Sequence, residues 1–115
     1  MEPPDLFSPE LKKGSIEMLI LSLIEARPRH GYEIGKLIEQ RSGGRLTFAL
    51  PTLYPTLLRL ESRGVIRGRW VERPGERHRC FYRLTPKGRR ALDQHRRTWR
   101  SYVAAVDDIL GTSDA

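Results

Sequence analysis

Cysteine and long apolar runs are scarce in this sequence. Cys80 is the only cysteine, so no intrachain disulfide can form and nothing favours an oxidising compartment. Apolar runs such as Met18 to Leu21 fall far short of a membrane span. Residues 1–5, MEPPD, lack the basic start and apolar stretch of a signal peptide. We therefore expect a cytoplasmic protein with no membrane partner.

The sequence also lacks the motifs of catalysis and metal binding. It has no nucleophile elbow, no glycine-rich phosphate loop and no paired carboxylate set among its basic residues. His78 and Cys80 have the spacing of two metal ligands, but a structural zinc site needs four, and only His30 and His95 remain. We expect no enzyme activity, no metal and no cofactor, and we interpret His30 as the start of a helix.

Positive charge is abundant and confined to one part of the chain. The 115 residues carry 21 Lys and Arg against 14 Asp and Glu, a net charge of +7. Residues 59–100 hold fourteen basic and four acidic side chains, whereas residues 1–58 are balanced and residues 101–115 carry only three acids. All but four of the cations are Arg, which suits phosphates and base edges, although a GC-rich genome also raises Arg content. An anionic partner is the expectation.

Apolar periodicity predicts two helices before the basic segment. The first follows Ser15 as N-cap, ends before Pro28, and has an apolar face made of Ile16, Leu19, Ile20, Leu23 and Ile24. The second opens at His30-Gly31 and closes at Ser42-Gly43-Gly44. Residues 1–9, with three prolines, are expected to be irregular, and residues 46–48 to form a short strand.

A third helix is predicted from about Pro51-Thr52 to Gly64, with Thr52 or a neighbour as its cap. Leu53, Leu57 and Leu60 lie on its core face. The opposite face is polar and basic, has no acid, and consists of Thr52, Pro55, Thr56, Arg59 and Arg63.

The rest of the chain predicts a hairpin and a final helix. Strands at 65–72 and 78–84 flank a polar turn at 73–77. Thr85-Pro86 then begins a helix that ends at Gly111. Its heptad stripe predicts a homodimer; the alternative is that the stripe folds back on its own domain. The predicted dimer contacts are Leu92, His95, Trp99, Tyr102, Val103, Val106, Ile109 and Leu110.

This order of elements indicates a winged helix-turn-helix, a mainly α fold with a small β-hairpin. The third helix would enter the DNA major groove, and the hairpin wing would lie on phosphates or in the minor groove. The domains expected are an arm at 1–14, a DNA-binding domain at 15–85, a dimerisation helix at 86–110 and a tail at 111–115.

Several motifs resemble the PadR family of bacterial transcriptional regulators over nearly the whole chain. They are LKKGSIEMLIL at 11–21, HGYEI at 30–34, TLYP at 52–55, RLE at 59–61, RG at 63–64 and YRLTPKG at 82–88. The length is similar to the short subfamily with one C-terminal dimerisation helix. The resemblance implies a homodimeric repressor that binds double-stranded DNA at a palindromic promoter operator and is released by a small molecule or stress signal.

The resemblance also implies roles for individual residues. Thr52, Tyr54, Thr56 and Arg59 would lie on or beside the recognition helix. On this helix we expect Thr56 and Arg59 to face base edges, and Thr52, Tyr54 and Arg63 to hold phosphates. The alternatives are that this polar face is only solvated and that the Tyr54 ring packs inward beside Leu58. Arg73, Arg77 and Arg79 match wing positions where the family carries Lys or Arg, although the tip at 74–76, PGE, is shorter and less basic than many family wings.

An effector site is also implied, because multidrug-sensing relatives place an aromatic residue of the last helix in a pore between subunits. Trp99 and Tyr102 are the candidates here; the alternative is that they only pack the dimer, and Arg96, Arg97 and Arg100 disfavour a cationic ligand. A second hypothesis for the whole protein is a winged-helix module that contacts RNA or protein without reading duplex DNA sequence.

Overall fold

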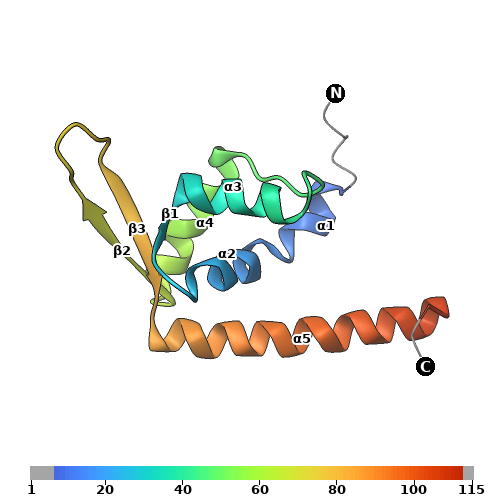
Figure 1. The fold of residues 1–115 in the computed structure, drawn as a ribbon. Helices are drawn as coiled ribbons and strands as arrows, with labels where there is room; N and C mark the ends of the chain where they lie inside the picture. The colour runs from blue at the N-terminus through green and yellow to red at the C-terminus, as the bar shows by residue number, and fades with distance from the viewer. Residues whose placement is uncertain (1–6, 113–115) are drawn as a thin grey trace.

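The computed structural model describes residues 7–112 and is mainly helical, with one small sheet. Its three strands form an antiparallel sheet in the order β1-β3-β2, and the β2–β3 hairpin projects away from the helices (Figure 1). The elements in chain order are α1 (Pro9–Lys13), α2 (Ile16–Ile24), β1 (Arg29–His30), α3 (Gly31–Arg41), α4 (Leu50–Ser62), β2 (Ile66–Val71), β3 (Arg79–Leu84) and α5 (Pro86–Leu110). This agrees with the predicted mainly α architecture with a hairpin.

The core lies between α2, α3, α4 and the inner face of the sheet. Leu53, Leu57 and Leu60 of α4 are fully buried, as their spacing predicted. Ile66 and Tyr82 close the core from the sheet. Burial of so many branched apolar side chains, each worth about 1.5–3 kcal/mol, fixes α4 against the sheet and leaves its other side free.

Local capping sets where the helices begin and end. The His30 ring accepts a hydrogen bond from the Glu33 amide at 3.1 Å, and the Thr85 hydroxyl accepts one from the Gly88 amide at 3.0 Å. Gly64 and Gly111 follow α4 and α5 in the left-handed conformation, with φ of 77° and 74°. Ser15 does precede α2, but its hydroxyl donates to the Lys12 carbonyl instead of capping α2.

Two short elements differ from the prediction. Residues 46–48 form no strand, because the Leu46 amide and carbonyl both bond to the Ser42 hydroxyl instead of to another strand. The short strand is β1, ahead of α3, where Arg29 and His30 pair with Tyr82 and Phe81. The segment expected to be irregular lies partly outside the described residues, but at its end α1 begins at Pro9, capped by Ser8. Proline is tolerated there because the first helical amide needs no internal partner.

The first half of α5 belongs to the core of the domain. Leu92 is fully buried, so its predicted place in a dimer contact is wrong. Arg96 forms an ion pair with Glu25 at 3.0 Å, just after α2. This ion pair lowers the pKa of the Glu25 carboxyl, chiefly through the hydrogen bond from Arg96. The second half differs, because the large apolar side chains Trp99, Tyr102, Ile109 and Leu110 are all exposed.

Candidate nucleic-acid interface

Helix α4 presents an exposed face without an acidic residue. This face consists of Pro51, Thr52, Pro55, Leu58, Arg59 and Ser62. Arg59 is its cation. Leu58, which is 63% exposed, was not predicted as a site residue, although an apolar position outside the core stripe was its signal in the sequence. An exposed leucine beside an arginine can contact a thymine methyl while the guanidinium contacts guanine.

Thr56 has a different place from the one predicted. Its side chain is only 1% exposed, so a base-edge contact by Thr56 is wrong. The physical reason is position, because Thr56 lies one residue before Leu57 and four before Leu60, on the flank of the buried stripe. Its hydroxyl donates to the Thr52 carbonyl at 2.8 Å and accepts from Arg59 Nη2 at 3.0 Å. The buried Thr56 hydroxyl therefore restricts the position of the Arg59 guanidinium, three residues further along the helix.

Tyr54 and Arg63 flank this face and are both engaged within the protein. The Tyr54 ring lies against Gly31 of α3, where a Cβ would come within 2.8 Å of the ring, yet the residue remains 44% exposed. Arg63 bonds to the Glu17 carboxylate at 2.8 and 3.3 Å, and its side chain is about half exposed. Either residue can reach a phosphate only from the edge of α4.

The three predicted wing arginines do not lie together. Arg73 and Arg77 are exposed in the turn between β2 and β3. Arg79, at the start of β3, is half-buried instead, with Nη1 3.1 Å from Nδ1 of His30 and its guanidinium 5.7 Å from the Tyr32 ring. Arg79 thus joins the wing to the start of α3.

Tyr32 and Lys36 form a further basic patch with Arg79 that the sequence analysis missed. Tyr32 is 50% exposed, and the Lys36 ammonium lies 6.0 Å from the centre of its ring, so both cations flank the same aromatic side chain. Only the fold reveals this patch, because it joins residues 43 positions or more apart in the chain. The first helix of a helix-turn-helix crosses the DNA backbone, which is where such a patch would contact phosphates.

The position of His30 predicts a pH dependence of stability. Burial, followed by the positive charge of Arg79, lowers the pKa of His30 from its ordinary value of 6.5. The unfolded chain therefore binds a proton on this residue at a higher pH than the folded protein does, so stability is lost as the pH falls below about 6.5. Protonation also removes the ring acceptor that caps α3.

Urea unfolding of a His30→Asn variant between pH 7 and pH 5 checks this expectation. Asparagine is a good N-cap that does not titrate, so the variant should lose much of the decline in stability that the parent protein has in this range. His78→Asn is the control for a histidine that caps no helix, since His78 lies exposed in the wing with Nε2 3.0 Å from the Glu72 carboxylate, and this variant should retain the decline. An equal decline in the parent and in His30→Asn would contradict the assignment.

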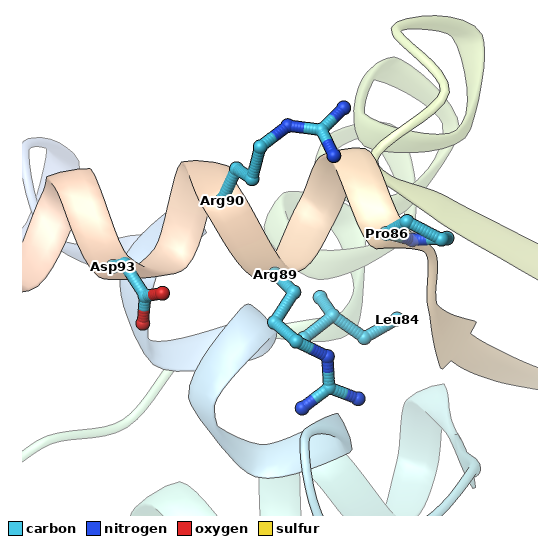
Figure 2. Close-up of a pocket in the computed structure, with 5 residues that line it drawn as sticks. All are labelled: Leu84, Pro86, Arg89, Arg90 and Asp93. Atoms are coloured by element: carbon cyan, nitrogen blue, oxygen red, sulfur yellow. The ribbon is translucent and has the colours of Figure 1, made fainter.

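A shallow pocket of about 400 Å³ lies at the junction of β3 and α5. Its lining residues are Leu84, Pro86, Arg89, Arg90 and Asp93. Figure 2 shows that Arg89 and Arg90 leave α5 on opposite sides, with Asp93 on the side of Arg89. The two guanidinium groups therefore do not converge on one ligand atom, and Asp93 would repel an anion.

The predicted effector residues lie next to one another on α5. The ring centres of Trp99 and Tyr102 are 6.5 Å apart and tilted by 36°, with Trp99 46% exposed and Tyr102 64% exposed. Across residues 7–112, no three His, Cys, Asp or Glu side chains gather as metal ligands. Within the same range, no helix combines the length and apolar character needed to cross a membrane.

A helix-turn-helix of α3 and α4 followed by a hairpin, with an exposed acid-free face on α4, defines a winged-helix DNA-binding protein. The chain belongs to the PadR-like family of transcriptional regulators, whose family model matches residues 20–94. This confirms the predicted family and fold class. Members of the family are DNA-binding transcriptional regulators and not enzymes.

Solved structures of transcriptional regulators support the same assignment. A transcriptional regulator from Clostridium thermocellum is 29% identical, with a TM-score of 0.82 over 90% of this chain and 97% of that one. A PadR family regulator from Eggerthella lenta is 32% identical, with a TM-score of 0.79 over 90% and 88%. An uncharacterized transposon protein of Streptomyces fradiae is 37% identical over 90% of this chain, which spans 30% of that protein.

Proposed function

We propose that this protein is a homodimeric, cytoplasmic transcriptional repressor that binds a palindromic promoter operator and leaves it when an effector binds. The observation that carries the proposal is the acid-free exposed face of α4, with Arg59 held on it by Thr56, beside a basic hairpin. In this proposal Arg59 and Leu58 contact bases in the major groove. The phosphate contacts come from Thr52, Tyr54, Arg63, Arg73, Arg77 and Arg79, together with Tyr32 and Lys36.

The operator is tested with the purified protein and duplex DNA from its own upstream region. A scrambled duplex of equal length is the control, and both are measured at two salt concentrations. We expect a preference of about 10³-fold or more for one site and a steep loss of affinity with salt. Protection should cover two half-sites about 34 Å apart. Equal, weak binding to both duplexes would contradict the proposal and favour an RNA or protein partner.

The exposed apolar side chains of α5 support the dimer. Ile109 is 84% exposed and Leu110 67% exposed, close to the end of a helix whose Leu92 is buried in the core of the domain. Water contact of such side chains is unfavourable, and a second copy of the same helix would cover them. His95, Val103 and Val106 lie half-buried along the same helix and complete the proposed contact with Trp99 and Tyr102.

Ile109→Asp should convert the dimer to a monomer, because it places a charge in the proposed apolar contact. Sedimentation velocity at micromolar concentration measures the change. Ala104→Asp is the matched control: Ala104 is exposed on the other side of α5, so this variant should remain dimeric. A parent protein that sediments as a monomer would contradict the dimer.

The proposed effector site is the aromatic pair Trp99 and Tyr102 at the dimer contact. Of the nearby arginines, Arg96 is already paired with Glu25, which leaves Arg97 and Arg100 as the cations closest to solvent. A planar dye that stacks on this pair should quench tryptophan fluorescence, and Trp70→Phe separates its signal from the exposed tryptophan of the wing. Absence of quenching in Trp70→Phe at high dye concentration would contradict the site.

A further inference from the structure

The outer face of the sheet carries a groove whose lining residues are not among the DNA contacts proposed above. Its volume is about 620 Å³, within the range of small-molecule sites. Its lining residues are Pro28, Arg67, Gly68, Arg69, Val71, Phe81 and Arg83. The groove thus runs across β2 and β3 to the residue that precedes β1.

Three arginines in this groove have no acidic partner. Arg67 of β2 stands directly opposite Arg83 of β3 in the antiparallel register, and Arg69 follows on the same face of β2. Within residues 7–112, none of the three makes an ion pair or a side-chain hydrogen bond. Like charges directly opposite on neighbouring strands destabilise a sheet. An anion between Arg67 and Arg83 would remove that repulsion.

The other lining residues determine the rest of the ligand. Pro28, Val71 and Phe81 supply apolar surface beside the three guanidinium groups, and Phe81 is partly buried. Inorganic phosphate would satisfy the cations but leave this surface in water. An organic anion with a flat apolar body would cover the apolar surface and place its charged group on Arg67 and Arg83.

The groove also adjoins the helix-turn-helix. Phe81 packs edge-on against His30, with ring centres 5.2 Å apart, and His30 caps α3. Arg79, the neighbour of His30, lies two residues before Phe81 on the same strand. A ligand on Phe81 would therefore lie one side chain away from the junction between the wing and α3.

We propose that this groove is a binding site for a small organic anion with a flat apolar body. The charged group of the ligand binds Arg67 and Arg83, and its apolar body lies on Phe81, Val71 and Pro28. This site lies on the outer face of the sheet and is separate from the aromatic pair on α5. Its use as a regulatory site rests on the proposed function, whereas binding of the anion does not.

The test measures binding of naphthalenesulfonate to the free protein by titration calorimetry. We expect one molecule per chain in the groove, and a loss of at least about tenfold in affinity at this site in Arg67→Gln/Arg83→Gln. The same double variant should have a raised Tm, because the repulsion across the strands is gone. The charge-matched control is Arg41→Gln/Arg45→Gln, at the last residue of α3 and in the turn that follows it, and it should bind the probe like the parent protein.

The ligand charge is tested with naphthylmethylammonium, which carries a cation on the same ring system and should not bind in the groove. Equal binding of naphthalenesulfonate by the parent and Arg67→Gln/Arg83→Gln would overturn the proposal, as would equal binding of the two probes in the groove. The proposal would also be overturned if the parent protein does not bind naphthalenesulfonate. In that case, weaker binding of every duplex by Arg67→Gln/Arg83→Gln would show what the arginines bind instead. That result would make the groove a contact for DNA phosphates. Because the probe is titrated without DNA, a failure of operator binding would appear in the DNA experiment and would leave the result of the probe titration unchanged.

Discussion

Gly88→Ala is expected to destabilise the protein by about 3 kcal/mol or more, at the upper end of the cost of overpacking. A Cβ at this position would lie 1.9 Å from the Val65 carbonyl oxygen and 2.8 Å from a Leu84 methyl carbon. The nearest atom belongs to the backbone, which cannot swing aside as a side chain can. The Thr85 amide also bonds to this carbonyl, so relief of the overlap would break the junction between the wing and α5.

Urea unfolding followed by circular dichroism measures the loss. Gly14→Ala is the matched control, because a Cβ there meets no atom within 4 Å and the backbone φ of −72° suits alanine. We expect its stability to stay close to that of the parent protein. Equal stability of Gly88→Ala and Gly14→Ala would show that the junction is looser than the structure indicates.

Arg59→Ala is expected to cost about 1–3 kcal/mol of operator binding and to weaken discrimination between operator and scrambled duplex. Arg59 is the cation on the exposed face of α4, and Thr56 restricts its guanidinium. A direct contact with a guanine edge explains both effects. Competition binding with operator and scrambled duplexes measures them.

The control for Arg59→Ala is Arg97→Ala on the exposed surface of α5, which removes the same charge far from α4. Its operator affinity should change little beyond the general effect of one charge. An equal loss on every duplex in Arg59→Ala would instead assign Arg59 to a phosphate. Thr56→Val then tests the support of Arg59, since it removes the hydroxyl and retains a similar shape.

The sequence predicted those parts of the fold that depend on local pattern. Leu53, Leu57 and Leu60 recur at helical spacing, and the structure buries all three. Thr85 followed by Pro86 marks a helix start that needs no tertiary information. The strand β1 was missed because its two residues have no pattern of their own and are extended only through pairing with Tyr82 and Phe81.

The candidate site was predictable at the level of elements but not of every side chain. Thr56 is polar and lies next to the buried stripe of α4, so its residue type predicts an exposed side chain. The core is wide enough to include this position, and the structure buries Thr56. Leu92 fits the heptad of α5, yet the same position also faces α2, and packing within the domain takes it. The patch of Tyr32, Lys36 and Arg79 exists only because β1 pairs with β3.

The joint at the start of α5 also bears on the operator that the proposed dimer can accept. Thr85 and Lys87 attach the helix to the turn after α4. The Thr85 hydroxyl and amide donate to the carbonyls of Gly64 and Val65, and the Lys87 ammonium donates to the Arg63 carbonyl. With 25 residues, α5 is a rod of about 37 Å. A tilt of about 10° at the joint would move its far end by about 6 Å, or about two base pairs along DNA. The stiffness of this joint would therefore determine how far the distance between the two half-sites can vary in an operator that the dimer binds.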